Sequence, residues 1–187
     1  MYHISNDKRV KKSVQLICCA LSECLKTKKI SEVTVTDISR VSSVSRSTFY
    51  RLFDNVIDVL AYQCDLIFED AITLYSNTIL FTHDFILLFI KVCLEHRTLI
   101  REIVSSNRVD LLYNSHLKYS YAIKDTIFHS KNITDSQMKY ILSFLTAAIV
   151  SVITTREEKS ITDSPEEVYE YCKRSIEFLN DNFFING

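Results

Sequence analysis

Glycine, proline and tryptophan are nearly missing from this sequence of 187 residues. It contains one glycine, the final Gly187, one proline, Pro165, and no tryptophan. Loops that cradle a phosphate need glycine, because it lets the backbone approach the ligand closely, so P-loops and glycine-rich dinucleotide sites are excluded. Tight β-hairpins need positive φ angles, and a β-sandwich or barrel would need many of them. The scarcity favours an all-α fold whose connections use Ser, Thr, Asn and Asp.

Long apolar runs are also missing. The longest uncharged segment, Tyr140–Thr155, has sixteen residues, whereas a helix that spans a bilayer needs about 20. The apolar run Val14–Leu21 follows a basic cluster, as in a secretion signal, but it has no small-residue cleavage site and continues into charged residues at helical spacing. We therefore expect a soluble, cytoplasmic protein that does not bind a membrane.

The cysteines do not form a recognisable framework. There are six, and Cys18 and Cys19 are adjacent. This pattern is typical of reduced, mostly buried thiols in a cytosolic protein.

Because hydrophobic residues make up 47% of the chain and charged residues 24%, there is enough apolar material for a packed core.

The charge is distributed unevenly along the chain. Residues 1–60 carry ten Lys and Arg and six Asp and Glu, a net charge of +4, whereas residues 61–187 carry a net charge of −5. A basic N-terminal part attached to an acidic remainder is the first indication of a nucleic-acid partner.

Apolar residues recur at helical spacing through most of the chain. Val14, Ile17 and Leu21, for example, share one face of the first helix. Capping residues such as Thr34 and Ser45 mark helix starts. We predict helices over residues 8–26, 35–41, 46–53, 55–75, 83–96, 97–105, 108–130, 135–157 and 164–183. We divide the chain into a domain of residues 1–54 and a second of residues 55–187.

Two short helices in the basic part have the pattern of a helix-turn-helix. Ile38 and Val41 are expected to face inward from the first helix, and Val44 to fill the turn. The second helix is expected to bury three residues, Phe49, Leu52 and Phe53.

The outer face of the second helix carries polar and basic residues. Arg46 with Tyr50, and Ser47 with Arg51, are i, i+4 pairs, so all four crowd one side. Polar side chains at the start of a helix that enters the major groove can read base edges. Tyr and Arg one turn later can reach phosphates.

The same residues resemble the DNA-binding signature of the tetracycline-repressor (TetR) family of bacterial regulators. The resemblance is carried by Thr34–Ser39, Val44–Phe53 and Asp54–Leu60, and it covers residues 8–62. It implies a three-helix DNA-binding head on a helical regulatory bundle. The resemblance and the outer face of the second helix together predict the DNA-binding residues. They are Thr36, Ser45, Arg46, Ser47, Thr48, Tyr50, Arg51, Lys11 and Lys12.

The chain departs from the family pattern at several positions. The turn has Ser42-Ser43 where the family usually has Ala-Gly, so we expect Ser43 to adopt a left-handed conformation. Val56 stands where the family usually has a phosphate-binding Lys, which shifts phosphate binding onto Thr36, Tyr50 and the cluster Lys8–Lys12. That cluster can equally be a solvated helix start.

The resemblance also implies that the C-terminal helices dimerise. Residues 144–152 are apolar nearly all round, so one side of this helix must face a partner. A wholly intramolecular core is the alternative. The predicted dimer interface consists of Phe144, Ala147, Ala148, Ser151, Val152, Tyr171, Cys172, Ser175, Ile176 and Leu179.

The same helices would bind an effector, which the many aromatic residues behind the head suggest is an apolar or aromatic small molecule. Such aromatics can instead form a plain core. Cys93 and His96 lie i, i+3 apart and could bind a metal with His116 or His129, but an ordinary buried Cys beside a helix-end His is the preferred interpretation. We expect no metal, cofactor or catalysis. The candidate effector residues are Tyr62, Phe68, Tyr75, Phe85, Phe89, Cys93, His96, Tyr113, Tyr121, Phe128 and Phe144.

The function predicted from the sequence is that of a homodimeric repressor. It would bind a palindromic double-stranded DNA operator and be released by an effector. Two alternatives stay open. One is a regulator of the same fold that responds to a protein partner or activates transcription. The other is a helical small-molecule carrier that no longer binds DNA.

Overall fold

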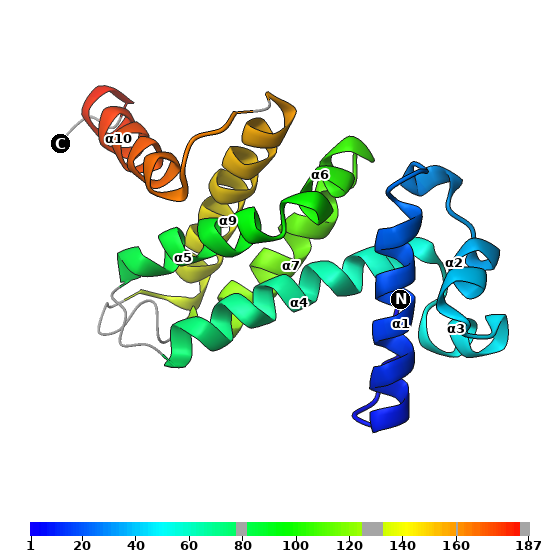
Figure 1. Cartoon of the computed structure of the whole chain (residues 1–187). Helices are drawn as coiled ribbons and strands as arrows, with labels where there is room; N and C mark the ends of the chain where they lie inside the picture. The colour runs from blue at the N-terminus through cyan, green and yellow to red at the C-terminus, as the bar shows by residue number, and fades with distance from the viewer. Residues whose placement is uncertain (78–81, 125–132, 160, 184–187) are drawn as a thin grey trace.

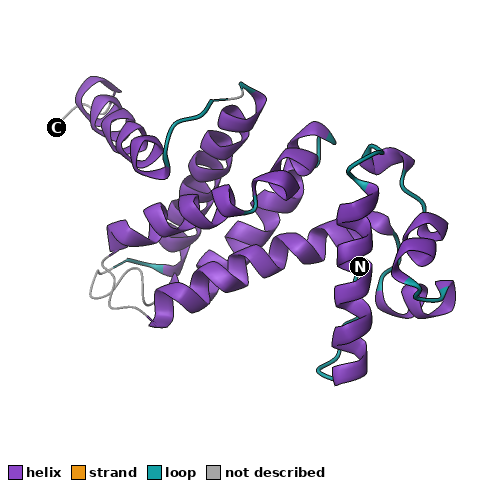
Figure 2. Ribbon diagram, in the orientation of Figure 1, coloured by secondary structure: helices purple, strands orange, loops and turns teal. Residues whose placement is uncertain are grey.

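Most of the residues that the structure describes lie in α-helices. The structure is a computed structural model, and the described residues are 1–77, 82–124, 133–159 and 161–183. A head of α1 to α3 and a body of α5 to α10 are joined by α4, which belongs to both (Figures 1 and 2). The all-α prediction is confirmed. The helices are α1 (Lys8–Cys24), the 3-10 turn η1 (Ile30–Glu32), α2 (Val35–Ser42), α3 (Arg46–Leu52), α4 (Val56–Asn77), α5 (Thr82–Glu95), α6 (Arg97–Ser105), α7 (Val109–Ala122), α9 (Asp135–Glu158) and α10 (Pro165–Phe183).

The first helix buries the face that its apolar spacing predicts. The Asp7 carboxylate caps its start by accepting a backbone N–H two residues later, at 2.7 Å. Val14, Ile17 and Leu21 are buried, and α1 packs against α2 and α4. The helix ends at Cys24, two residues before the predicted end.

The prediction for α2 is wrong at one position. Ile38 is fully buried, but Val41 is 44% exposed. The buried side of this helix consists of Val35, Ile38 and Ser42, which lie within one narrow arc of the helical wheel. Val41 lies about 90° from the middle of that arc, so it faces solvent.

The long helix α4 begins with a cap formed by Asn55 and Asp58. The Asn55 side chain accepts the N–H of Asp58 at 3.1 Å, and the Asp58 carboxylate accepts the N–H of Asn55 at 3.2 Å. The preceding Asp54, which is also of a residue type that often caps helices, instead pairs with His3 at 3.2 Å. A reciprocal cap of this kind satisfies two backbone donors at the start of the helix.

One hydrophobic core runs from the head through α4 into the body. It includes Ile38 and Phe49 in the head, Leu60 and Cys64 on α4, and Phe89 on α5, all buried. The division of the chain near residue 54 therefore does not interrupt the core, and it remains a prediction.

The body is built around α9, which packs against α5, α6 and α7, while α10 packs against α5. By length and composition α9 could cross a membrane, and 33% of its most apolar window is buried in this fold. The helix predicted over residues 108–130 is found as α7, which ends at Ala122; residues 125–132 lie outside the described part. The remaining predicted helices agree with the structure within two residues.

Candidate nucleic-acid interface

The turn between α2 and α3 is compact and held from inside. The Ser42 hydroxyl is buried and accepts the N–H of Val44 at 3.1 Å, and Val44 itself is buried beneath the turn. Ser43 has φ 57° and ψ 17°. The expected left-handed conformation at Ser43 is thereby confirmed; it costs a residue with a Cβ roughly 1–2 kcal/mol.

The second helix of the motif, α3, is fixed to the core by three buried residues. Phe49, Leu52 and Phe53 are at most 2% exposed, and the rings of Phe49 and Phe53 lie 5.8 Å apart. The Ser45 hydroxyl caps the start of α3 by accepting the N–H of Thr48 at 3.2 Å. This short helix is therefore held firmly enough to present its other face in one orientation.

That other face carries the predicted recognition residues. Arg46, Ser47, Tyr50 and Arg51 are all exposed, and within the described part of the chain no ion pair engages either arginine. Thr48 differs, because it is half-buried and its hydroxyl accepts a hydrogen bond from Ser45 at 3.0 Å. The exposed face is thus made by four of the predicted residues.

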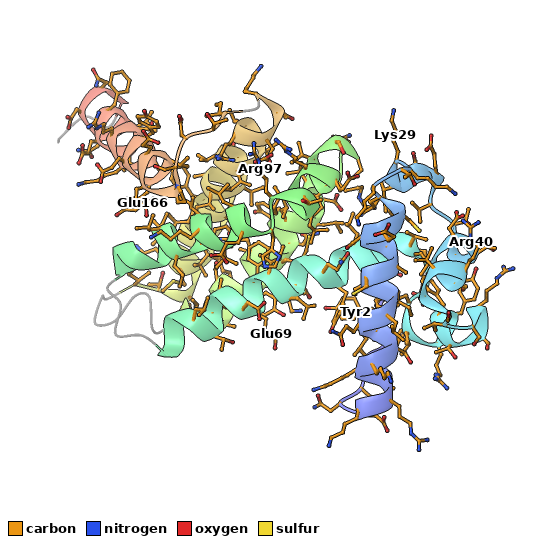
Figure 3. All side chains as sticks on the ribbon, viewed as in Figure 1. Tyr2, Lys29, Arg40, Glu69, Arg97 and Glu166 are labelled. Atoms are coloured by element: carbon orange, nitrogen blue, oxygen red, sulfur yellow. The ribbon has the colours of Figure 1, made fainter. Side chains whose placement is uncertain are left out.

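Other predicted contacts lie on the neighbouring helices. Thr36 is exposed near the start of α2, and Lys11 and Lys12 are exposed in the first half of α1. Arg40, which the sequence analysis passed over, is i+4 from Thr36 and therefore shares its face of α2. It is labelled on the outer side of the head in Figure 3.

Asp37 orders the start of α2 and its charged neighbours. Its carboxylate accepts the backbone N–H of Thr34 at 3.0 Å and pairs with Lys28 at 2.8 Å and Arg40 at 3.3 Å. The hydrogen bond from Lys28, with those from Thr34, holds the pKa of Asp37 well below its usual range. Asp37 therefore stays ionised and orients these two cations of the head.

The aromatic residues of the body do not surround a common cavity. Phe68, Phe89 and Cys93 are buried together, with the Phe68 and Phe89 rings stacked at 4.8 Å, and the space between them has no room for a water molecule. Tyr62 packs against Tyr2 instead. His96 is exposed, although Cys93 is buried. Tyr113 and Tyr121 line two separate hollows. Phe144 lies elsewhere, on α9. Tyr75, Phe85, Phe128 and His129 have side chains outside the described part.

His116 is buried at the centre of this aromatic cluster. Its ring meets the Phe89 ring edge-to-face, with the centroids 4.6 Å apart. Its Nδ1 lies 2.8 Å from the Thr146 hydroxyl and 3.2 Å from the Ser120 hydroxyl. No described group bonds to its Nε2. Burial lowers the pKa of His116 to about 4, so the ring is neutral at physiological pH.

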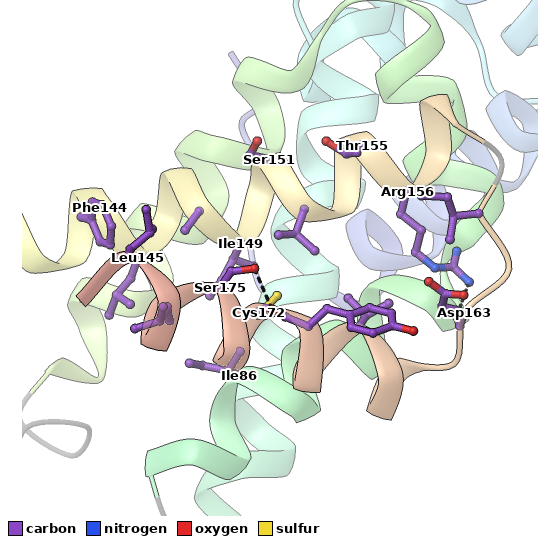
Figure 4. Close-up of a pocket in the computed structure, with 17 residues that line it drawn as sticks. Ile86, Phe144, Leu145, Ile149, Ser151, Thr155, Arg156, Asp163, Cys172 and Ser175 are labelled. Atoms are coloured by element: carbon purple, nitrogen blue, oxygen red, sulfur yellow. Dashed lines mark hydrogen bonds between the residues drawn. The ribbon is translucent and has the colours of Figure 1, made fainter. Parts of the chain in front are cut away.

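A groove of about 330 Å³ separates α9 from α10 (Figure 4). Its walls are mainly apolar, and Arg156 and Asp163 stand at one end. Several large residues beside it are exposed, including Phe144 at 62% and Ile176 at 52%. All the predicted dimer residues line this groove except Ala147, which lines a hollow beside Tyr113.

A buried carboxylate on α9 gathers three arginines, which the sequence analysis did not identify. Glu157, whose side chain is 1% exposed, pairs with Arg97 at 3.1 Å, Arg101 at 2.8 Å and Arg156 at 2.8 Å. Burial alone would raise the pKa of Glu157, but the hydrogen bonds from Arg101 and Arg97 outweigh it and lower the pKa. Figure 3 shows Arg97 where α6 meets α9. This cluster fixes α6 to the end of α9.

Neither a protein-family profile nor a curated protein sequence matches this chain. Several solved structures do. A protein from Listeria innocua has 16% identity and a TM-score of 0.79, over 95% of this chain and 96% of that one. A TetR transcriptional regulator from Streptococcus agalactiae has 16% identity and a TM-score of 0.63, over 91% and 96%.

A third match is the dihydroxyacetone kinase operon activator DhaS, with 18% identity and a TM-score of 0.61, over 88% of this chain and 94% of that one. These likenesses extend over nearly the full length of each chain. The chain therefore has the fold of the TetR-family transcriptional regulators.

Proposed function

We propose that this chain is a TetR-family transcriptional regulator that binds operator DNA as a homodimer. The observation that carries the proposal is the exposed face of Arg46, Ser47, Tyr50 and Arg51 on a helix whose opposite face is locked into the core. A helix that served only the core would have no need to gather on its outer side two arginines that form no ion pair with any described residue.

In this proposal α3 enters the major groove of the DNA. Arg46 lies at the first position of α3, where a guanidinium can form two hydrogen bonds with a guanine edge. Tyr50, one turn later, and Thr36 on α2 are better placed for phosphates, and so are Lys11 and Lys12. Ser45 and Thr48 support the helix start through the cap. Ser47 is exposed, and its hydroxyl, which lies 3.0 Å from the Ser45 hydroxyl, is proposed to contact a base.

A second copy of the chain would cover the groove between α9 and α10. A large exposed apolar surface on a folded protein usually marks an interface, and a two-fold dimer uses the same surface on both copies. The two α3 helices would then read the half-sites of a palindromic operator, whose centres lie about 34–36 Å apart or a multiple of that distance.

Regulation would act through the separation of the two recognition helices. An effector that binds the body more tightly when α4 is tilted would favour the tilted state and lower the operator affinity. An apolar or aromatic small molecule at the predicted residues Tyr62, Phe68, Phe89 and Phe144 would need the body to open, because Phe68 and Phe89 are closely packed. A protein effector would not need the body to open.

Activation of transcription is the second candidate. The name of one structural neighbour, the dihydroxyacetone kinase operon activator DhaS, shows that this fold occurs in an activator. A reporter gene behind the bound DNA separates the two modes, because deletion of the regulator raises expression from a repressed promoter and lowers it from an activated one.

The central experiment is the effect of Arg46→Ala on DNA binding. The wild-type protein first selects a duplex from a random pool. Arg46→Ala should weaken the binding of that duplex by roughly 1–3 kcal/mol and relax the base preference at one base pair of each half-site. Arg174→Ala, which removes the same charge from exposed α10, is the control. Equal weakening of selected and scrambled duplexes would make Arg46 a phosphate contact. If the wild-type protein retained no duplex, the carrier alternative would be favoured.

A further inference from the structure

The residues before α1 pair with the end of the recognition helix. We define residues 1–4 as the N-terminal arm. The backbone N–H of His3 donates to the carbonyl of Leu52 at 2.8 Å, and Tyr2 and Phe53 form an antiparallel bridge. Leu52 is the last residue of α3, where carbonyls have no partner within the helix. The arm therefore caps the C-terminal end of α3.

The side chain of Tyr2 connects the arm to α4. Its ring packs edge-to-face on the ring of Tyr62, with the centroids 5.2 Å apart, and Tyr62 also packs against Phe53. The Tyr2 hydroxyl donates a hydrogen bond to the carboxylate of Asp65. Tyr2 is half-buried beside α1 (Figure 3), so this contact lies between the head and the body.

The same carboxylate is held by α7. Asp65 is 9% exposed, and it accepts hydrogen bonds from the Ser115 hydroxyl at 2.5 Å and the Lys118 ammonium at 2.6 Å. Burial alone would raise the pKa of Asp65, but the hydrogen bonds from Lys118, Ser115 and Tyr2 outweigh it and lower the pKa. One ionised group thus joins the arm, α4 and α7.

The position of α7 is in turn set by the interior of the body. Next to Ser115 in the sequence is His116, which is buried against Phe68, Phe89 and Thr146. A shift of α7 along α4 would pull Ser115 and Lys118 away from Asp65, and it would leave Tyr2 as the main donor to a buried charge. Buried carboxylates that lose hydrogen-bond donors are costly, so the cluster favours one relative placement of α7, α4 and the arm.

We propose that Tyr2 and Asp65 are positioning residues that set the orientation of α3 on the body. This inference rests on the proposed function, because its readout is DNA binding. The hydrogen bond from Tyr2 holds the arm on α4, and the arm holds the end of α3. Loss of that bond leaves α3 folded but free to change its angle to α4. In a smaller fraction of dimers, the two recognition helices then have the separation that the half-sites require.

The test compares specific with non-specific binding. The probes are the duplex selected by the wild-type protein and a scrambled duplex of the same length. Tyr2→Phe removes the hydroxyl and keeps the ring, and Asp65→Asn removes the charge and keeps the shape. Each variant should bind the selected duplex about three- to tenfold more weakly. This loss corresponds to part of the free energy of a hydrogen bond to a charged group. Binding of the scrambled duplex should not change, because it depends on exposed lysines and arginines that contact phosphates, and both variants keep these residues.

A double variant adds a second criterion. If the two residues act through one contact, Tyr2→Phe should cause no further loss in the Asp65→Asn background. Tyr169→Phe, which removes a hydroxyl from another half-buried tyrosine, on α10, is the matched control and should bind like the wild type. Circular dichroism confirms that each variant is folded under the binding conditions.

The outcomes are distinct. Equal weakening of both duplexes would mean that the variants only reduce the amount of active protein, and it would overturn the positioning role. So would unchanged binding accompanied by a lower melting temperature. If the wild-type protein selected no duplex, the proposed function would fail, and the positioning role with it.

Discussion

His116 should make the folding stability of this protein depend on pH between pH 5 and pH 7. The ring is buried among Phe68, Phe89 and two hydroxyls, and burial lowers its pKa from 6.5 to about 4. In the unfolded chain it regains an ordinary pKa. Between these two values the unfolded state binds a proton and the folded state does not, so stability is fully present above pH 6.5 and decreases as the pH falls.

The size of the effect follows from the two pKa values. Lowering the pH from 7.5 to 5.0 should cost about 2 kcal/mol of unfolding free energy through this residue. Carboxylates whose pKa is lowered by folding, such as Asp65 and Glu157, also make the protein less stable as the pH falls. Their effect appears at lower pH, where the carboxylates become protonated. Comparison of the wild type with a His116 variant above pH 5 therefore isolates the histidine.

The assay is urea unfolding at several pH values and one protein concentration, for the wild type and His116→Gln. The glutamine does not titrate and can still accept a hydrogen bond from Thr146. The difference in unfolding free energy between the two proteins should shrink by about 2 kcal/mol as the pH falls from 7.5 to 5.0. His96→Gln, at an exposed histidine, should show no such trend. A difference that stays constant over this range would refute a buried, neutral His116.

Three further predictions concern assembly and stability. Ala148→Arg places a charge in the groove between α9 and α10 and should give folded monomers by light scattering that lose specific DNA binding, whereas Ala122→Arg, at an exposed alanine on α7, should remain dimeric; a dimeric Ala148→Arg would exclude this groove as the interface. Ser43→Gly relieves the left-handed strain at φ 57° and should raise the unfolding free energy by about 1 kcal/mol in chemical denaturation; a decrease would contradict the strain. Glu157→Gln leaves buried Arg156 without its counter-charge and should lower stability by about 3 kcal/mol, while the neighbouring, exposed Glu158→Gln should change it little.

The local features of the head could be predicted from the sequence because their signals are short-range. The capping pair Thr34 and Asp37, the buried Phe49 and the left-handed Ser43 all depend on residues within a few positions of one another. Val41 is the exception. Apolar character placed it inward, but Ser42 takes the buried position at the end of α2, since its hydroxyl satisfies the N–H of Val44.

The contacts that join the head to the body could not be predicted, because they link residues far apart in the chain. Tyr2 is 63 residues from Asp65, and Ser115 is 50 residues from it. Arg97 meets Glu157 across 60 residues. No spacing rule connects such positions. The aromatic residues of the body illustrate the opposite difficulty, because composition alone does not distinguish a cavity lining from the close packing of Phe68 against Phe89.

The groove between α9 and α10 has a consequence for gene dosage. If a second copy must cover it before DNA is bound, the amount of active protein follows the square of the chain concentration wherever free chains are in excess. While most operator sites are empty, doubling the expression would then raise operator occupancy about fourfold by mass action. In that case the exposed Phe144 and Ile176 would do more than hold two copies together. They would make the response to protein level steeper than one-to-one binding allows, so that halving the synthesis would lower the amount of active protein about fourfold.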